Sequence, residues 1–246
     1  MIARKFDLYF LQSLSLVQLM LRGNKVIMNR RVFLKYSSLS CAALLAGCAT
    51  ATEPSTPKTY EIFSDSYGSL KDGDYTLPTI PIKRIDKKYH RQIVKFHSTY
   101  PRGTIIVNTP QRFLYLILGG GRAMRYGISV GKEGLAWEGE AYISFKREWP
   151  RWTPTPGIIE RSPRYKKYAK NGMAPGLRNP LGARALYLFD KKTRQDTYFR
   201  LHGTPVWSSI GKAASSGCIR LINQDVIDLY NRVEPGPLTR VIVIQG

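Results

Sequence analysis

Apolar and polar residues follow one another in short runs over most of residues 103–246, a pattern typical of β-strands. β-Branched and aromatic residues dominate these runs, as they do in strands. The predicted strands are 104–107, 112–118, 122–130, 141–146, 185–189, 198–201 and 240–244. Many short strands of this kind favour a mainly β domain, built as a sandwich or a partly closed barrel.

The run over 112–118 is expected to lie in the interior. Both alternating faces of 113–118 are apolar, which predicts a strand that is covered on both sides. The glycine triplet 119–121 follows and permits a tight turn, so 112–118 and 122–130 should form a hairpin.

One clear helix is predicted near the C-terminus. Over 225–233 the apolar residues recur at helical spacing and lie largely on one stripe. Asn223 has the side chain of an N-cap, and the stretch 235–237, Pro-Gly-Pro, ends the helix. A shorter helix is expected over 87–94, in a basic stretch that precedes the strands.

The N-terminal region has the features of an export signal. Arg30 and Arg31, followed by an apolar run over 39–46, resemble a twin-arginine signal, and the run is too short to span a bilayer. The sequence Leu-Ala-Gly-Cys that ends at Cys48 resembles a lipobox, which implies cleavage before Cys48 and a lipid on its thiol. An uncleaved membrane anchor is the alternative.

Two further stretches precede the strands. The apolar stretch 10–21 indicates either an over-extended gene start, with Met28 the initiator, or a long n-region, and we favour the first. Residues 49–67 are rich in Thr, Pro and Ser, which predicts a flexible tether. Residues 68–100 are expected to form an N-terminal extension that lies against the domain.

The chain is strongly basic. It has 38 Lys and Arg residues against 17 Asp and Glu, a formal net charge of +21. Such a surface attracts a polyanion: nucleic acid, anionic lipid headgroups, or the carboxylate-bearing polymers of a cell wall. The sequence has no RNP-like aromatic run, zinc-ligand spacing or recognition-helix pattern, so nucleic acid is not an expected partner. A generic basic surface that aids solubility is the alternative.

A long segment without clear periodicity, 149–180, interrupts the strands. Long loops of this kind often form lids or binding loops. We expect Trp149 and Trp152 to wall a cleft, with nearby cations binding the carboxylates of a ligand. In the alternative interpretation the tryptophans cover the core and the cations face solvent.

One short stretch near the C-terminus holds the residue types of nucleophilic catalysis. A thiol attacks a carbonyl as the thiolate, and a nearby imidazole can stabilise the ion pair and later return the proton. Cys218 and His202 fit these roles, and the backbone N–H groups of Gly217 and Cys218 are candidates for an oxyanion hole. Polar and cationic neighbours, including Ser215 and Arg220, suit a thiolate better than an apolar core does. An inert, buried cysteine is the alternative.

Cysteine usage supports the catalytic interpretation. The chain has three cysteines, of which Cys41 would be removed with the signal and Cys48 would carry the lipid. Cys218 would then be an unpaired thiol in a compartment that favours disulfides, where an exposed thiol is a hazard unless it is used.

These residues resemble the catalytic signature of the bacterial L,D-transpeptidases, the YkuD domain family. The signature stands here as His202-Gly203-Thr204 and as Ser215-Ser216-Gly217-Cys218-Ile219-Arg220-Leu221. The likeness continues upstream through 103–107, 112–116 and 179–186, and so covers the chain from Gly103 to its end. Many members have a second histidine where this chain has Ser216.

The resemblance implies a β-sandwich-like catalytic domain that performs acyl transfer on peptidoglycan stem peptides. Cys218 would form a thioester with a tetrapeptide stem, and His202 would act first as base and then as acid. The supporting residues would be Ser215, Ser216, Gly217 and Gly203 at the oxyanion hole or its loop, and Arg220 and Trp152 at the substrate. For Arg220 the alternative, which we favour, is that it holds the loop. No metal or organic cofactor is expected.

Three parts are predicted: an export signal over 1–48, a tether and extension over 49–100, and a catalytic domain over 101–246. The protein is expected in the periplasmic cell envelope, anchored to a membrane through its lipid. With water as the acceptor it would be an L,D-carboxypeptidase or another cysteine hydrolase, and with an inactive site a wall-binding lipoprotein. The acceptor, the membrane and the oligomeric state are left open by the sequence.

Overall fold

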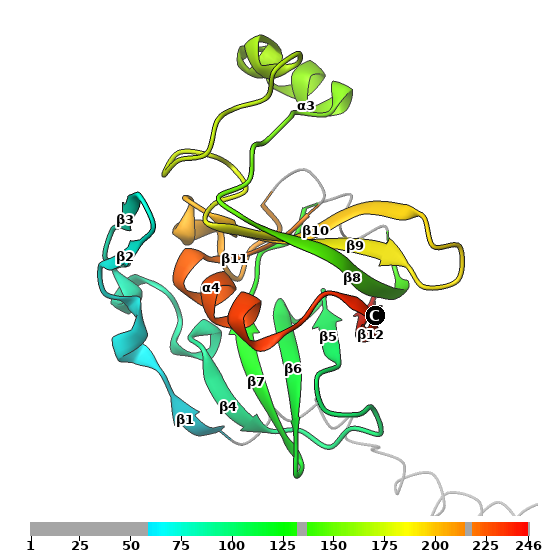
Figure 1. Cartoon of the computed structure of the whole chain (residues 1–246). Coiled ribbons are helices and arrows are strands. Elements are labelled where there is room, and N and C mark those ends of the chain that lie inside the picture. Colours follow the sequence, from blue (N-terminus) through cyan, green and yellow to red (C-terminus); the bar gives the residue numbers. More distant parts are fainter. Residues whose placement is uncertain (1–58, 132–136, 215–217, 246) are drawn as a thin grey trace, which may run out of the picture. The chain divides into compact units, whose positions relative to one another are not determined.

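The described part of the chain is built on one large sheet. A computed structural model describes residues 59–131, 137–214 and 218–245 (Figure 1). Ten strands are hydrogen-bonded in the order β1-β4-β7-β6-β5-β12-β8-β9-β10-β11, and β2 and β3 form a separate small hairpin. The strands are β1 Thr59–Ile62, β2 Leu70–Asp72, β3 Tyr75–Leu77, β4 Gln92–Lys95, β5 Ile105–Asn108, β6 Phe113–Gly119, β7 Arg122–Gly127, β8 Gly139–Glu148, β9 Arg184–Asp190, β10 Asp196–Thr204, β11 Ile219–Ile222 and β12 Gly236–Ile244.

The large sheet folds over on itself. In Figure 1 the half with β5, β6 and β7 faces the half with β8, β9 and β10, and β12 joins them by pairing with both β5 and β8. The core between the halves contains buried residues of each, such as Leu114, Ile143 and Leu186, together with Val226 and Leu229 of α4, Asn223–Arg232. The expected mainly β, sandwich-like fold with a C-terminal helix is confirmed.

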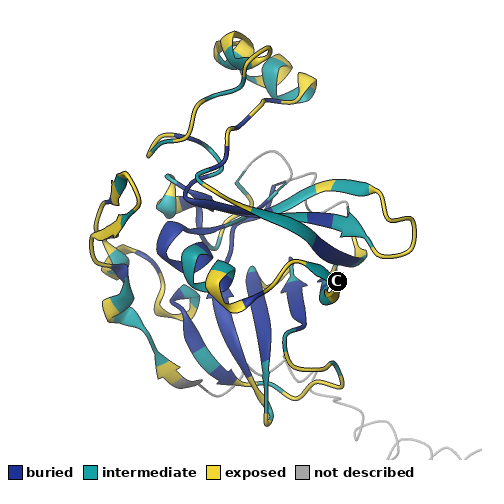
Figure 2. Cartoon of the chain, viewed as in Figure 1, coloured by how far each residue is buried: buried dark blue, intermediate teal, exposed yellow. Residues whose placement is uncertain are grey.

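The local pattern predicted most strands correctly. Each of the seven predicted runs overlaps a strand of the sheet, although 122–130 runs past the end of β7, and β1, β4 and β11 were not foreseen. β6 is covered on both sides as expected, since Leu114 and Leu116 lie in one core and Phe113 and Tyr115 in another. Figure 2 shows β6 and β7 buried along most of their length.

Two predictions about helices were wrong. Residues 87–94 do not form a helix: a single 3-10 turn, Lys87–Tyr89, is followed by β4, which pairs with β7. Asn223 begins α4 but does not cap it, because its Oδ1 accepts a hydrogen bond from the Ala183 N–H at 3.0 Å. In both cases a hydrogen bond to a distant part of the chain outweighs the local preference.

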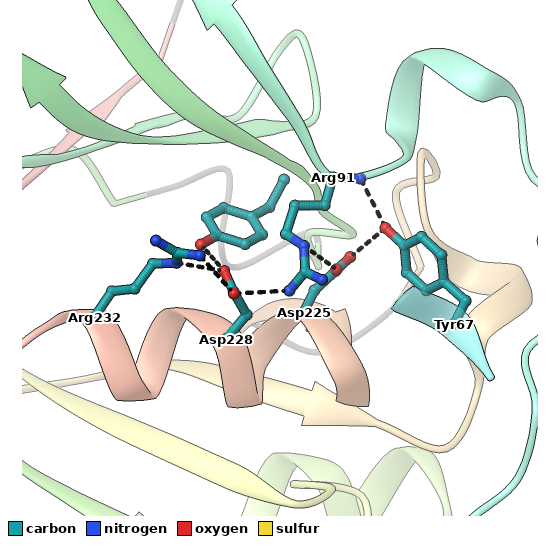
Figure 3. Close-up of polar contacts among 6 residues, drawn as sticks. Tyr67, Arg91, Asp225, Asp228 and Arg232 are labelled. Carbon is teal, nitrogen blue, oxygen red and sulfur yellow. Dashed lines mark hydrogen bonds and ion pairs between the residues drawn. The ribbon is translucent and has the colours of Figure 1, made fainter. Parts of the chain in front are cut away.

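The extension before the domain contacts the C-terminal helix through buried polar groups (Figure 3). The Tyr67 hydroxyl, at the end of the 3-10 turn Ser64–Tyr67, donates to Asp225 Oδ2 at 3.1 Å and accepts from the Arg91 N–H at 2.7 Å. The Arg91 guanidinium lies 3.0 Å from Asp228. These contacts join the extension to α4, which directly follows β11.

The helices of the described ranges are short. α4 has ten residues and is the longest of them, and none is long and apolar enough to cross a membrane.

Candidate functional site

Two neighbouring strands bring His202 and Cys218 together. β10 and β11 run parallel, with Leu201 opposite Ile219 and His202 opposite Arg220. Cys218 directly precedes β11, so it lies next to Arg200 on β10, within one strand spacing of about 4.8 Å. The register of this one strand pair therefore brings His202 and Cys218 close together, although they are well separated in the sequence.

Both side chains line the same cavity. A cavity of about 340 Å³ is lined by His202, Cys218 and Arg220, together with Trp152 and Tyr165 of the 149–180 segment. A second cavity of about 620 Å³ also reaches Cys218 and is lined on the sheet by Tyr187, Tyr198 and Arg200. Cys218 and Trp152 line both, so the two cavities adjoin at this cysteine.

The Cys218 sulfur lies beside an irregular part of β10. The pairing register of β10 shifts between Asp196 and Arg200, and Tyr198 within this bulge has φ 60° and is 78% exposed. Sγ lies 3.8 Å from the Tyr198 carbonyl oxygen. Burial raises the pKa of Cys218 above its ordinary value, although the Arg200 N–H and the charges of Arg200 and Arg220 act in the opposite direction.

His202 is buried and electrically neutral. Only 4% of it is exposed, and burial together with the charge of Arg220 lowers its pKa to about 3, against hydrogen bonds to the Gly203 and Leu181 backbones. Nδ1 lies 2.6 Å from the Gly203 carbonyl oxygen. Because that oxygen can only accept, Nδ1 carries the proton and Nε2 is left able to take another.

The electrostatics differ from the ion pair considered from sequence. A raised thiol pKa and a lowered imidazole pKa both favour the neutral forms. The two groups are therefore expected as a thiol and a neutral imidazole rather than as an ion pair.

Gly203 allows a close approach behind His202. A Cβ on Gly203 would lie 2.2 Å from Asn223 Oδ1, and one on Gly182, whose φ is +63°, would lie equally close to the same atom. Asn223 therefore bridges β10 and the start of β9, and Gly203 supports the strand that carries His202.

The segment 149–180 extends away from the sheet in Figure 1 and carries a short helix, α3 Pro156–Arg161, and a 3-10 helix, Pro163–Tyr168. Trp152 is only 8% exposed, contacts the Tyr165 ring edge-on at 5.0 Å and lines both cavities, as expected of a cleft wall. The expectation for Trp149 was wrong. Its indole N–H donates to Asp72 at 2.8 Å and its ring contacts Tyr75, so it packs on the β2-β3 hairpin instead.

The cavities are strongly cationic. Their linings include five arginines, which are Arg151, Arg161, Arg164, Arg200 and Arg220. Arg220 also donates to the Ala214 carbonyl at 2.9 Å, so it supports the loop before Cys218 while lining the smaller cavity. A site with this charge favours carboxylate-bearing ligands.

Several predicted residues lie outside the described ranges. Ser215, Ser216 and Gly217, and with them the oxyanion hole, remain predictions, as does lipidation of Cys48. Among the residues that are described, no group of three or more His, Cys, Asp and Glu lies together as a metal site would require.

Sequence reasoning missed residues that shape the site. The fully buried Asn179 donates to the carbonyls of Pro150, Met173 and Ala174, and so ties together the base of the 149–180 segment. Arg200 lies beside Cys218 and is held by a bidentate pair with Asp196 at 2.6 and 2.7 Å. The only sign of Arg200 in the sequence was a charged residue within the otherwise apolar or aromatic end of the strand predicted over 198–201. The bulge in β10 left no sign in the sequence.

Comparisons with known proteins agree with this geometry. The model of the L,D-transpeptidase catalytic domain, YkuD, matches residues 102–243. A putative L,D-transpeptidase of Fuscovulum blasticum, from the ATP synthase subunits region, is 36% identical over 110 residues, 45% of this chain and 52% of the relative. The probable L,D-transpeptidase YcfS of Escherichia coli is 33% identical over 146 residues, 58% of this chain and 44% of the relative. The chain thus spans about half the length of these curated relatives.

A solved structure from Brucella melitensis, described as a probable carnitine operon oxidoreductase caia, is also similar. It is 51% identical, covers 63% of this chain and 95% of its own, and has a TM-score of 0.45. The family model matches more than half of the 246 residues, and the chain therefore belongs to the YkuD family of L,D-transpeptidases.

Proposed function

We propose that this protein is a cysteine-dependent L,D-transpeptidase that acts on the stem peptides of peptidoglycan. The observation that carries the proposal is the common cavity lined by Cys218, His202 and Arg220, next to a second cavity that reaches the same sulfur. The basic lining suits stem peptides, because these carry free carboxylates.

In the first half-reaction Cys218 Sγ attacks the carbonyl carbon of the amide between diaminopimelate and the terminal D-alanine. The thiol proton passes to His202 Nε2 as the S–C bond forms, and the carbonyl becomes a tetrahedral oxyanion. Collapse of this intermediate breaks the C–N bond, and His202 gives the proton to the departing amine. The products are a thioester on Cys218 and free D-alanine.

In the second half-reaction an amine attacks the thioester carbonyl. His202 takes a proton from the attacking nitrogen and returns it to the sulfur as the C–S bond breaks. Two cavities that meet at Cys218 would let a donor stem and an amine acceptor approach from different sides. With water in the second place the same steps would yield a bare tripeptide.

The neutral resting pair makes the transfer of the thiol proton the demanding part of the first half-reaction. An imidazole whose pKa is lowered to about 3 stays unprotonated at neutral pH, so Nε2 is free to take a proton, but the same low pKa makes it a weak base, and the thiolate must be stabilised as it forms. The nearby charges of Arg200 and Arg220 stabilise the thiolate as it forms, which partly offsets the cost of burial.

The cellular setting belongs to the proposal. The export signal before Cys48 and a lipid on that residue would hold the protein at a membrane of the periplasmic envelope, with the 49–67 tether giving reach to the wall. Stem peptides and the membrane are the proposed partners, and no cofactor is proposed.

Mass spectrometry tests the proposal. The protein is incubated with disaccharide-tetrapeptides, and both the intact protein and the products are analysed. We expect a tripeptide adduct on Cys218, release of D-alanine and cross-linked dimers, and we expect His202→Gln to slow adduct formation by about 10²–10⁴-fold. Bare tripeptides without dimers would identify a hydrolase. Absence of any adduct, or an adduct that persists in Cys218→Ala, would contradict the enzyme assignment.

A further inference from the structure

One carboxylate of the β2-β3 hairpin holds both ends of the 149–180 segment. Asp72 Oδ2 accepts a hydrogen bond from the Trp149 indole N–H at 2.8 Å, and its two oxygens accept from the Arg184 guanidinium at 2.7 and 2.8 Å. Trp149 is the first residue of the segment, and Arg184 begins β9 shortly after the segment ends. A single side chain of the extension therefore joins the two points at which the segment leaves the sheet and returns to it.

The ion pair of Asp72 and Arg184 is shielded from water. The Arg184 side chain is 5% exposed and the Asp72 side chain 17%. A bidentate pair in such a place fixes the direction as well as the distance of its partners, and salt screens it less than an exposed pair. The Tyr75 ring of the same hairpin packs on Trp149 with centroids 4.2 Å apart, so Trp149 is held by its ring as well as by its N–H.

The hairpin is in turn fixed to α4. The Gln224 side chain, in the first turn of that helix, donates to the Gly68 and Pro78 carbonyls at 3.1 and 3.2 Å, one on each side of the hairpin. Gln224 is only 4% exposed. α4 directly follows β11, and Cys218 directly precedes β11. The hairpin thus connects the 149–180 segment to the part of the molecule that carries the nucleophile.

The backbone of Trp149 is held in an unfavourable conformation. Its φ of 40° lies in the left-handed region, where a residue with a bulky side chain is rarely found. Such a conformation persists only where its surroundings hold it in place. The restraints here are the two contacts with the hairpin and a hydrogen bond from the Trp149 N–H to the Ala183 carbonyl at 2.7 Å. Without Asp72 the backbone at Trp149 is expected to relax, and the segment that it begins would change direction.

Beyond Trp149 the base of the segment is stiff. The Trp152 and Met173 backbones exchange hydrogen bonds of 3.0 and 2.6 Å. The buried Asn179 side chain adds bonds to the carbonyls of Pro150 and Met173, one on each side of this base. A change of backbone conformation at Trp149 would therefore turn the segment as a unit and leave its internal structure in place.

The direction of the segment sets the width of both cavities at Cys218. Trp152, Ile158 and Arg161 of the segment line each cavity, and the sheet supplies the opposite wall. Because the segment supplies one wall, a turn at its base would change the distance between the two walls. A peptide that contacts both walls would then bind only to the fraction of molecules in which the segment stands in its present position.

We propose that Asp72 is a positioning residue for the proposed transpeptidase: it holds the 149–180 segment at the distance from Cys218 that peptide substrates require. Asp72 is not among the residues that line either cavity, so it acts through Trp149 and Arg184. The extension before the catalytic domain is thereby part of the working site. This inference rests on the proposed function, since it concerns the binding of the same substrate.

The kinetics of D-alanine release from the disaccharide-tetrapeptide test the inference. In Asp72→Ala the apparent affinity should fall with the fraction of molecules in the competent position, whereas bound substrate reacts as before because His202 and Cys218 belong to the sheet. We expect KM to rise by about tenfold, the effect of one charge-assisted hydrogen bond, with kcat within about twofold of the wild type. Trp149→Phe keeps a ring on Tyr75 but loses the N–H donor, and it should raise KM by a smaller factor.

Two controls separate positioning from stability. Asp74→Ala makes the same change of charge in the turn of the same hairpin, where the carboxylate is exposed, and should keep the wild-type KM. Asp228→Asn removes a carboxylate that joins the extension to α4 through Arg91, and should lower the melting temperature without raising KM. Partial unfolding lowers the active fraction and hence kcat, so it does not imitate a rise in KM.

The outcomes are distinct. An unchanged KM in Asp72→Ala and Trp149→Phe, or a fall in kcat alone, would overturn the inference while the proposed function stands. An equal rise of KM in Asp74→Ala would also overturn it, because charge alone would then explain the effect. If Asp72→Ala does not fold, the KM of Trp149→Phe decides. A wild type that releases no D-alanine and forms no adduct would instead overturn the proposed function, and this inference with it.

Discussion

At the scale of single residues, the candidate site depends on protonation states that the sequence does not reveal. The residue types at 202 and 218 indicate thiol chemistry, but their pKa values follow from burial and from the arginines on neighbouring strands. Both pKa shifts favour the neutral forms of the thiol and the imidazole. A neutral pair and a preformed ion pair differ in how the reactivity of the thiol changes with pH, so this dependence can tell them apart.

Alkylation by iodoacetamide measures this dependence, because the reagent reacts with the thiolate. Burial raises the pKa of Cys218, so the alkylation rate should rise steadily with pH and have a midpoint above about 8.5, the value of a free cysteine. A thiolate stabilised by an imidazolium would instead react at a rate that levels off near neutral pH. Such a plateau in the wild type, lost in His202→Gln, would contradict the neutral pair.

Tyr198 combines a strained backbone with an exposed ring. Its φ of 60° lies in the left-handed region, which glycine adopts without cost, and its carbonyl faces the Cys218 sulfur. We expect Tyr198→Gly to be more stable to urea than Tyr198→Ala by about 1 kcal/mol, since both lose the ring but only alanine keeps the strain. Equal unfolding midpoints for the two variants would show that the backbone of the bulge is not strained.

At the scale of elements, the sequence predicted those parts whose pattern is local. The apolar run of β6 and the helical stripe of α4 are visible in a few consecutive residues, and both formed. The short helix over 87–94, the Asn223 cap and the position of Trp149 were wrong because each residue bonds to a partner far along the chain: β7, Ala183 and Asp72 respectively. Residues that join distant elements carry no periodic signal.

Asn179 shows how such a residue can control a whole segment. Its amide donates to three carbonyls at 3.0 to 3.3 Å, and it is completely buried. Asn179→Ala should destabilise the protein by about 1–3 kcal/mol, because the Pro150 carbonyl, whose bond to Asn179 is buried, loses its side-chain donor. Amide hydrogen exchange should become faster over 150–174, because the bonds from Asn179 hold the two ends of this segment together. The exposed Asn171→Ala should have neither effect, and exchange that is faster throughout the chain would contradict a local role.

At the scale of the whole molecule, the extension and the catalytic sheet meet at buried charges on α4. Asp225 is fully buried, and burial raises its pKa to about 7, despite Arg91 and the Tyr67 hydroxyl. Asp228, one turn later, has a lowered pKa, because hydrogen bonds from Arg232 and Tyr126 outweigh its burial. Figure 3 shows Arg91 between the two carboxylates. The two carboxyl groups of α4 therefore make the free energy of unfolding depend on pH in opposite directions.

The sign of each effect can be worked out from linkage. The folded pKa of Asp225 lies above its ordinary value of 3.8, so its contribution to stability is complete below pH 3.8 and is lost as the pH rises through about 7. The free energy of unfolding of the wild type, relative to Asp225→Asn, should therefore fall between pH 4 and 8 by up to about 4 kcal/mol. Urea unfolding of both proteins over this range measures the difference.

Asp228→Asn is the matched control, because the folded pKa of Asp228 lies below its ordinary value. Its contribution is present above that ordinary value and is lost only as the pH falls through the folded pKa, so the difference between wild type and Asp228→Asn should stay constant from about pH 5 to 8. If the two asparagine variants show the same pH dependence, Asp225 is ionised in the folded protein, and the junction between the extension and α4 is an ordinary ion pair with Arg91. If only Asp225→Asn removes the fall, the junction weakens toward neutral pH, and the extension would be held most firmly where the carboxyl is protonated.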